Sequence, residues 1–520
     1  MAWLLLLHAL CLSTVASASR AVARASLTAS VDPPERARIS IPVLGTVALP
    51  PVMFAIMDTE LFQRLRGVKQ LGLADMVYPG AVHSRFEHSV AVCYRSFERA
   101  TRFARGNVPD EEKTAVLIGI AGLLHDIGHP PLAHAGERLL QGILKGWEHE
   151  AASAKIVKSI LKEPNVRSKF ALEGEKFRLE DSDVQFVQEL INPPKKELRK
   201  AHDRKDIGKK WSSLIKSRDI RYSWCFEIVA NWRGGPDVDR EDYMVRDIHH
   251  AQLGGSNIYE LDRLMKSDLR LMRYAYDETN PGVATLGFPR RAAKNLRRWF
   301  FEVRKDLHEK LYQHRVTTVL ENGHLPEILS LAFPGIQVVN STGDLVSISE
   351  ALSLESFDAA AFARCTDSLV LERLENAEVH AKFLMLQGLR EHGENLLRAG
   401  QLWREVRTRN FAKTCASIDS EREIATMKAL KKDFENISSY QIFAHQGEKQ
   451  RDPLEGIYFG DGFGDSESLP SQSLRFEHGS DYFGKRTAIV YYRPPPGRSD
   501  DEVKRMRNNI AAICVRERTR

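Results

Sequence analysis

The stretch from His83 to Glu150 carries HSRFEH at 83–88, LLHDIGHPPLAH at 123–134 and WEHE at 147–150. Six of the 17 histidines of the chain lie in it, interspersed with acidic residues: His83, His88, His125, His129, His134 and His149. Imidazoles and carboxylates are the groups with which proteins hold divalent transition metals. The stretch therefore predicts a metal centre around which the fold is organised.

An apolar run, AVLIGIAGLL at 115–124, leads directly into the adjacent pair His125-Asp126. Its unbroken hydrophobicity predicts a buried helix. A buried carboxylate needs a partner, because an unpaired buried charge is strongly unfavourable, and a metal would supply one. An isolated His-Asp pair is more often a hydrogen-bonded pair at a helix end, but the surrounding histidines favour the metal. Gly128 and the prolines at 130–131 should end the helix, so that His129 and His134 face one cleft across a turn.

A second group of acids follows in PDVDREDY at 236–243. Asp239, Tyr243 and Asp247 are spaced four residues apart, which on a helix places all three on one face. Two acids and a tyrosine make a poor core pattern. We therefore expect this face to line a polar cleft.

Composition describes a globular chain without a strong charge bias. The 520 residues are 43% hydrophobic and 28% charged, with a net charge of +6, which does not by itself predict nucleic-acid binding. The six cysteines form no CxxC pair, so neither a zinc knuckle nor a disulfide framework is indicated. The polar stretch 192–219 is expected to be a solvated loop, and without interleaved aromatic residues a nucleic-acid contact there is the less favoured interpretation.

The N-terminus has features of a targeting segment. An apolar run at 3–12 is followed by the small residues Ala16, Ser17 and Ala18, the spacing of a signal-peptidase site, and then by basic and hydroxylated residues. We expect residues 1–37 to be a targeting segment for secretion or an organelle, with a disordered tail as the alternative. No segment beyond the N-terminus could span a membrane.

The expected fold is mainly α, a helical core with a smaller mixed α/β C-terminal region. Residues 38–320 would form the core domain and residues 321–520 a helical and mixed region with a role in oligomerisation or regulation. RISIPVLGTVALP at 38–50 predicts a strand or turn, and FAIMDTELFQRLRGVKQLG at 54–72 a helix with Arg64, Arg66 and Lys69 on a solvated face. RTAIVYYRPPPG predicts a strand, DDEVKRMRNNIAAICV a last helix, and the Gly- and Ser-rich stretch 461–472 a mobile loop.

Five motifs in one order resemble the HD-domain phosphohydrolases, and most closely the SAM-and-HD-domain deoxynucleoside triphosphate triphosphohydrolases: DTELFQRLRGVKQLG, YPGAVHSRFEHS, AGLLHDIGHPPLAH, EIVANWRGGPDVDREDYMVRDIHH and LYQHR. The resemblance runs from about residue 38 onward and is strong to about 315; no SAM domain is recognised before it. It implies a metal-dependent enzyme of the dGTPase type that converts a dNTP to deoxynucleoside and inorganic triphosphate, with Fe, Mn, Zn or Mg as the divalent metal ion. It also implies a nuclear or cytosolic location, which leaves the localisation open against the N-terminal signal.

The resemblance assigns roles residue by residue. The metal ligands would be His88, His125, Asp126 and Asp239. His129, His134 and His149 would lie by the reacting phosphate, where one protonates the departing 5′ oxygen, together with Glu137, which stands where the family has Asp. Phosphates would be held by Arg85, Arg240, which replaces a family Lys, and Arg304. The sugar and base would be contacted by Gln70, Leu71, Tyr243, Asp247 and Tyr312, with Asp247 accepting from the 3′ hydroxyl and Tyr312 excluding a 2′ hydroxyl.

Regulation is implied by the same resemblance. A GTP or dNTP activator bound between subunits of a homo-oligomer, a dimer or tetramer, would meet Asp58, Gln63, Arg66, Arg409 and Lys413. The preceding ARISIPVLG departs from the family, because it lacks the Lys, Asn, Asp and His expected before the glycine. A second nucleotide site would use Val77, Tyr78, His314 and Arg315.

Two alternatives stay open. One is another HD-domain phosphohydrolase that acts on a cyclic nucleotide or a nucleoside monophosphate. The other is a non-catalytic protein that binds nucleotides or single-stranded nucleic acid through the basic segment near 195–218.

Overall fold

The computed structural model describes residues 37–519 except 173, 175–176, 205, 254–257, 275–282, 411–412, 420–422, 433–436, 443–457, 460–486 and 494–497. The expected targeting segment and the expected loop at 461–472 lie outside the described residues. Within them no helix combines the length and apolar character needed to cross a membrane.

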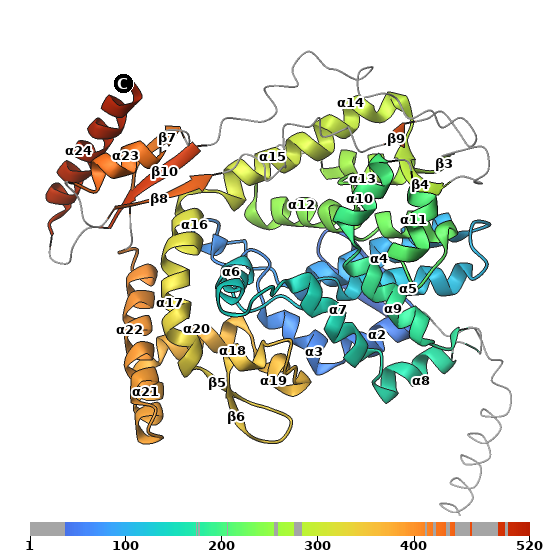
Figure 1. Ribbon diagram of the computed structural model, residues 1–520, viewed down its shortest axis with the longest axis horizontal. Coiled ribbons are helices and arrows are strands. Elements are labelled where there is room, and N and C mark those ends of the chain that lie inside the picture. Colours follow the sequence, from blue (N-terminus) through green and yellow to red (C-terminus); the bar gives the residue numbers. More distant parts are fainter. Residues whose placement is uncertain are drawn as a thin grey trace, which may run out of the picture.

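The described chain is mainly helical with small sheets, which confirms the predicted fold class (Figure 1). Its first part consists of β1 (Ala37–Ile41), β2 (Gly45–Leu49), α2 (Pro51–Met57), α3 (Glu60–Gln63), η1 (Arg64–Gly67), η2 (Ala74–Met76), α4 (Arg85–Ala104), α5 (Glu111–Leu124), α6 (Ala133–Ile143), α7 (His149–Ile160), α8 (Pro164–Leu172), α9 (Asp181–Ile191), α10 (Lys195–Asp203), α11 (Ile207–Leu214), η4 (Ile220–Glu227), α12 (Val238–Ala251) and α13 (Ile258–Ser267).

The second part begins with β3 (Arg270–Tyr274), β4 (Val283–Phe288), η5 (Arg290–Ala292), α14 (Ala293–Leu296), η6 (Arg297–Glu302), α15 (Val303–Leu307), η7 (His308–Tyr312), α16 (Arg315–Val319), η8 (Leu320–His324), α17 (Leu325–Ala332) and η9 (Phe333–Gly335). It continues with β5 (Gln337–Val339), β6 (Leu345–Ser347), α18 (Ile348–Ala351), α19 (Ala359–Arg364), α20 (Asp367–Glu375), α21 (Ala377–Leu386), α22 (Arg390–Arg407), β7 (Lys413–Asp419), α23 (Glu423–Leu430), β8 (Ile437–Ile442), β9 (Tyr458–Phe459), β10 (Thr487–Tyr492) and α24 (Asp500–Thr519).

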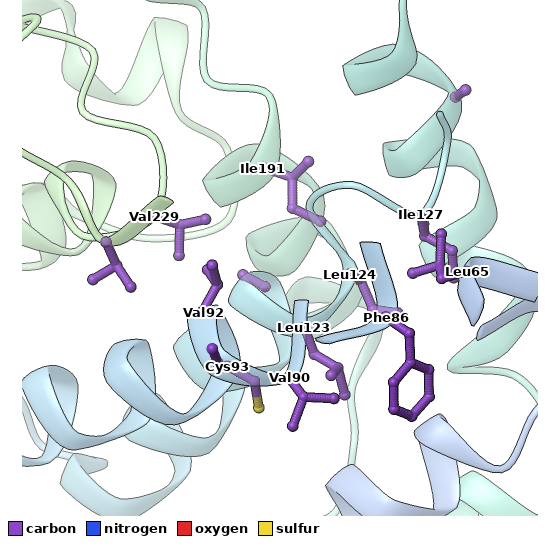
Figure 2. Close-up of a cluster of buried hydrophobic side chains, with 14 of the residues drawn as sticks. Leu65, Phe86, Val90, Val92, Cys93, Leu123, Leu124, Ile127, Ile191 and Val229 are labelled. Carbon is purple, nitrogen blue, oxygen red and sulfur yellow. The ribbon is translucent and has the colours of Figure 1, made fainter. Parts of the chain in front are cut away.

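Helix α5 forms the centre of the core. Every residue from Thr114 to Leu124 is buried, as the apolar run predicted, because α4 packs on one side and α9 on another. Figure 2 shows Val90 and Cys93 of α4 beside Leu123 and Leu124 of α5. The helix therefore ends inside the protein, and the His125-Asp126 pair begins there.

The segment before α4 is more broken than the sequence predicted. Residues 38–50 form the antiparallel hairpin β1–β2, with Ala37 opposite Leu49. The helix expected over 54–72 is instead α2, α3 and η1, because the Thr59 side chain accepts from Phe62 N at 3.3 Å and so starts a new helix. The prediction of a solvated face was wrong for Arg64, which is only 3% exposed.

The solvated loop expected at 192–219 was also wrong. The segment folds into α10 and α11, which bury Leu198, Ile207 and Trp211. The Trp211 indole is 1% exposed and donates to the Arg218 carbonyl at 2.9 Å. A few apolar residues within a charged run were enough to anchor both helices on the core.

Two helical segments carry the predicted site residues that follow residue 238 in the chain. Helix α12 holds Asp239, Tyr243 and Asp247 on one helix, as their spacing predicted. The run α14–η6–α15–η7 lies along it in Figure 1, and α15 packs on α12. Its π-helical segments, η6 and η7, flank Arg304 and end at Tyr312. Such widened turns are found frequently at functional sites.

The C-terminal part forms a separate small cluster at the upper left of Figure 1. Strand β10 lies between β7 and β8, antiparallel to both, and α23 and α24 pack nearby. Val490, Tyr492 and Leu430 are buried in its core. The strand and last helix predicted from the sequence are both present.

The close packing of α4 on α5 depends on Gly122. A Cβ atom there would lie 2.9 Å from the Val92 carbonyl oxygen and 2.6 Å from Ser96 Oγ. We expect Gly122→Ala to lower the free energy of unfolding by about 1–3 kcal/mol, because backbone atoms must move. Urea unfolding would measure it. Gly142→Ala is the matched control: its Cβ has open space, so about 0.5–1 kcal/mol of stabilisation is expected from helix propensity. Equal midpoints for the two variants would contradict this packing argument.

Candidate metal centre

Three helices bring the four predicted metal ligands together. His88 comes from the first turn of α4, His125 and Asp126 follow the end of α5, and Asp239 lies in the first turn of α12. Asp239 Oδ1 is 3.1 Å from His88 Nε2 and 3.4 Å from His125 Nε2. The Asp126 oxygens lie 3.8 Å from His88 Nε2 and 3.5 Å from His125 Nε2. The donor atoms thus converge on one point.

These donors fit a divalent transition metal. Metal bonds to imidazole and carboxylate of about 2.0–2.2 Å place neighbouring ligand atoms roughly 3 Å apart, close to the spacings seen. His88, His125 and Asp239 form one of the groups whose ligand atoms all lie within 4.8 Å of one another. The buried His125 Nε2 atom has no hydrogen-bond partner in the structure. A metal ion would satisfy it.

Hydrogen bonds on the far side of each ring orient the imidazoles. His88 Nδ1 lies 2.9 Å from Asp242 Oδ2, and His125 Nδ1 lies 2.8 Å from the Gly122 carbonyl. Asp242 is itself fixed by Arg246, whose Nε and Nη2 donate at 2.9 and 3.0 Å. Sequence analysis assigned Asp242 no role, although its position three residues after Asp239 places it on the same side of the helix.

The electrostatics of the site favour a cation. Burial opposes protonation of His88, but hydrogen bonds to Asp239 and Asp242 raise its pKa to about 10. Burial also opposes ionisation of Asp126, yet His125 and Arg85 hold the pKa of that carboxyl well below its usual range. A group of acids that draws a proton to a buried imidazole attracts a metal ion to the same place.

A second histidine cluster adjoins the first through Asp126. Asp126 Oδ1 lies 3.3 Å from His129 Nδ1, and the His129 and His149 rings are 3.9 Å apart. Glu137 Oε1 accepts from the His149 amide at 3.1 Å and lies 2.8 Å from His149 Nδ1. Glu137 Oε2 lies 3.2 Å from Nδ1 of His134, which is 62% exposed. The structure therefore brings all four predicted catalytic residues together.

The surroundings shift the pKa values of His129 and His149 in opposite directions. Burial, together with the positive charge of Arg85, lowers the pKa of His129 well below its ordinary value. For His149 burial acts the same way, but the Glu137 carboxylate outweighs it and raises the pKa. Despite its own burial, Glu137 has a pKa below its usual range because of His134 and His149. At neutral pH His149 is thus better placed than His129 to carry a proton.

Three of the predicted sugar- and base-binding residues, Tyr243, Asp247 and Tyr312, lie close together in two hydrogen-bonded pairs. Tyr312 donates from its hydroxyl to Asp247 Oδ2 at 2.7 Å, and Arg304 Nε donates to the Tyr243 hydroxyl at 3.0 Å. The Tyr243 and Tyr312 rings meet edge to face at 6.2 Å. His83, which received no role from the sequence, lies 2.8 Å from Asp247 Oδ1 and so orients this carboxylate.

The remaining predicted substrate contacts come from three segments: Gln70 and Leu71, Arg85 on α4, and Arg240 on α12. Arg85 pairs with Asp126 through Nη1 and reaches the Gln70 carbonyl at 3.4 Å. The Gln70 side-chain oxygen is buried without a hydrogen-bond partner, and Leu71 packs partly buried against the core. Arg240 donates to the carbonyls of Gly234 and Gly235, both at 2.9 Å.

The predicted regulatory residues lie on two segments. Asp58, Gln63 and Arg66 are close in the chain, and Arg66 Nε donates to Gln63 Oε1 at 2.7 Å. Arg409, just after α22, donates to the Met76 carbonyl at 2.6 Å. Lys413 begins β7, with its side chain outside the described residues. In the second predicted site, next to Val77 and Arg315, the rings of Tyr78 and His314 lie 6.0 Å apart.

Residues 85–202, which include His88, His125 and Asp126, match the HD domain family. The chain is similar to the deoxynucleoside triphosphate triphosphohydrolase SAMHD1 of Bos taurus, with 31% identity over 65% of this chain and 54% of that protein. It is 28% identical to the Homo sapiens protein of the same name over 66% and 51%. A putative HD domain-containing protein of Acanthamoeba polyphaga mimivirus is 25% identical over 72% of each chain. The chain thus spans about half the length of the two SAMHD1 proteins.

The Asp242 carboxylate offers a test of the metal centre. We expect Asp242→Asn to weaken divalent metal binding by about 10–100-fold, because the His88 ring loses the carboxylate that orients it. Metal content after dialysis against graded chelator would measure this. Asp306→Asn, an exposed position on α15, serves as control and should match the wild type. Identical retention in the two variants would exclude this role for Asp242.

Proposed function

We propose that the protein is a metal-dependent dNTP triphosphohydrolase of the dGTPase type, which releases deoxynucleoside and inorganic triphosphate and so serves dGTP catabolism. The observation that carries the proposal is the position of Asp126 between two clusters. Asp126 Oδ1 is 3.5 Å from Nε2 of His125, a predicted metal ligand. The same oxygen is 3.3 Å from Nδ1 of His129, which belongs to the second histidine cluster. A metal ion that activates water and a group that transfers a proton both contribute to phosphate-ester hydrolysis, and here the two clusters share one carboxylate.

The metal would be held by His88, His125, Asp126 and Asp239. When bound, a divalent ion lowers the pKa of a water and neutralises charge on a phosphate oxygen. The Asp239 side chain is 34% exposed, whereas His88 is fully buried, so the site opens towards solvent on the α12 side. Water and a phosphate oxygen would enter there.

The histidine cluster would manage the proton of the reaction. A water oxygen forms a bond to the α-phosphorus, the bond from that phosphorus to the 5′ oxygen breaks, and the 5′ oxygen takes a proton. We assign that proton to His149, because Glu137 raises the pKa of its imidazole and fixes the ring through Nδ1. His129, whose pKa is lowered, would accept hydrogen bonds beside it.

The surrounding residues would bind the nucleotide. Arg85, Arg240 and Arg304 carry the positive charge that a triphosphate requires. His83 contacts one carboxylate oxygen of Asp247, and the Tyr312 hydroxyl donates to the other. The carboxylate fixed in this way can accept a hydrogen bond from the 3′ hydroxyl. The ring of Tyr312 would crowd a 2′ hydroxyl, and Gln70 and Leu71 would face the base.

Regulation and assembly belong to the same proposal. A GTP or dNTP activator would bind at Asp58, Gln63, Arg66, Arg409 and Lys413 between the subunits of a homo-oligomer. We retain the division into a catalytic domain at 38–320 and a regulatory region at 321–520, with a targeting role for residues 1–37. The SAMHD1 relatives support the substrate class through their name.

The two alternatives remain testable. An HD phosphohydrolase for cyclic nucleotides or monophosphates would release no triphosphate. A nucleic-acid binder would need an exposed basic surface near 195–218, where the aromatic Trp211 that could stack on a base is 1% exposed. Among the described residues, no specific observation favours either alternative.

The reaction can be tested with the full chain, each of the four dNTPs and Mn or Mg, with and without GTP, and with products resolved by ion exchange. We expect deoxynucleoside and inorganic triphosphate, and their loss in Asp126→Ala but not in Asp306→Ala, which changes an exposed acid. Absence of triphosphate with all four dNTPs in both conditions would refute the proposed function.

The role of His149 predicts a change in the pH profile. A general acid is active when protonated, so kcat/KM falls as the pH rises through its pKa. Because Glu137 raises the pKa of His149, Glu137→Gln should lower that pKa and move the alkaline limb to lower pH, with a loss of about 10–100-fold near neutrality. Glu150→Gln, which changes a carboxylate 3.4 Å from His149, should produce a smaller shift. An unmoved alkaline limb in Glu137→Gln would assign the proton to another group.

A further inference from the structure

The connection between α5 and α6 contains two consecutive residues in the left-handed region. Leu132 has φ +60° and Ala133 has φ +51°, and neither is glycine. A Cβ atom makes this conformation unfavourable, so a pair of such residues persists only where the surroundings enforce it. Both side chains are buried, so the surrounding residues hold the turn in this conformation.

This strained turn sets the geometry of the histidine cluster. His129 lies before it, and His134 lies directly after it in the first turn of α6. The turn brings their rings to 5.6 Å of each other and allows Glu137, one helical turn later, to reach His134 and His149. If the backbone at 132–133 relaxed, α6 would leave in another direction and carry His134 and Glu137 with it.

A carboxylate from the C-terminal region fixes the turn. Asp367, the first residue of α20, is 2% exposed, and its Oδ1 accepts from the Leu132 amide at 2.7 Å. Its Oδ2 accepts from the Lys69 amide at 2.9 Å. Lys69 precedes Gln70, the proposed base contact, and bridges to Ser84 next to Arg85. One buried side chain thus joins the catalytic turn to the substrate-binding segment.

Arg64 fixes the other side of the same connection. Its Nη2 atom donates to the Ile127 carbonyl at 2.6 Å and to the His129 carbonyl at 2.8 Å. Its Nη1 atom donates to the Cys365 carbonyl at 2.9 Å, two residues before Asp367. The segment 365–367 therefore contacts the catalytic connection twice, once directly and once through Arg64.

We infer that Asp367 is a positioning residue for the catalytic centre: it maintains the strained turn at Leu132 and Ala133, and residues beyond 320 thereby complete the site. The inference rests on the proposed function for its kinetic readout. If Asp367 only stabilised the core, the effect of replacing it would not depend on whether residue 133 can adopt the left-handed conformation easily. A dependence on residue 133 therefore separates a positioning role from a purely stabilising one.

The test compares four full-chain proteins: wild type, Asp367→Ala, and Asp367→Ala combined with either Ala133→Gly or Ala135→Gly. Glycine at 133 removes the Cβ that opposes the left-handed turn, so the turn can form without the carboxylate. Glycine at 135 deletes the same methyl from ordinary helix and is the matched control. Asp367→Asn, which keeps the size and one acceptor oxygen, replaces Asp367→Ala throughout if the alanine variant does not fold.

We expect Asp367→Ala to lower kcat/KM by about a hundredfold, the effect of a displacement of about 1 Å at catalytic groups. Adding Ala133→Gly to Asp367→Ala should raise kcat/KM about fivefold, because glycine adopts the left-handed conformation without the steric cost of a Cβ atom. Adding Ala135→Gly should not raise kcat/KM. Equal activities of the two double variants, or an Asp367→Ala enzyme within twofold of wild type, would overturn the inference.

Hydrogen exchange provides a readout that needs no substrate. The peptide covering 127–134 should exchange faster in Asp367→Ala, and Ala133→Gly should slow it again where Ala135→Gly does not. If wild type hydrolyses no dNTP but this pattern appears, the proposed function fails and the positioning role stands. If hydrolysis occurs and exchange at 127–134 is unchanged by Asp367→Ala, the positioning role fails alone.

Discussion

The architecture depends on one buried carboxylate, Asp126, at the end of a helix with no polar face. Such a charge is stable only if several groups share it, and here it lies against His125, His129 and Arg85. Each partner comes from a different direction and must in turn be fixed. Arg85 is fixed by α4 and His129 by the connection to α6, while α12 reaches the same site through Asp239, which lies against His88 and His125.

The side chains of the site are oriented by hydrogen bonds to groups behind them, and some of those groups are held by further hydrogen bonds. The rings of the candidate ligands His88 and His125 are oriented by Asp242 and the Gly122 carbonyl, and Asp242 is held by Arg246, which also pairs with Glu87. The side chains of His88, Asp242 and Arg246 are fully buried, whereas those of Glu87 and Asp239 are 18% and 34% exposed. These hydrogen bonds fix the orientation of the rings, as outer-shell groups do for the ligands of a metal ion.

The sequence predicted the centre better than its surroundings. The apolar run before His125 can only be a buried helix, and four-residue spacing leaves Asp239, Tyr243 and Asp247 one possible face, so both were predictable from local periodicity. Arg64 and α10–α11 were not, because a charged residue is usually solvated and only the tertiary fold supplies the carbonyls or core that bury it. His83 and Asp367 act on partners 164 and 235 residues away, and no local pattern encodes such pairs.

The π-helical turns between residues 297 and 312 have a consequence for how this chain can vary. Each widened turn holds an additional residue, and together they determine which direction Arg304 and Tyr312 face when they meet Tyr243 and Asp247 on α12. Loss or gain of a single residue in this run would rotate everything after it around the helix axis. Length in this segment is consequently constrained as tightly as residue identity, whereas the surface loops elsewhere can tolerate insertions.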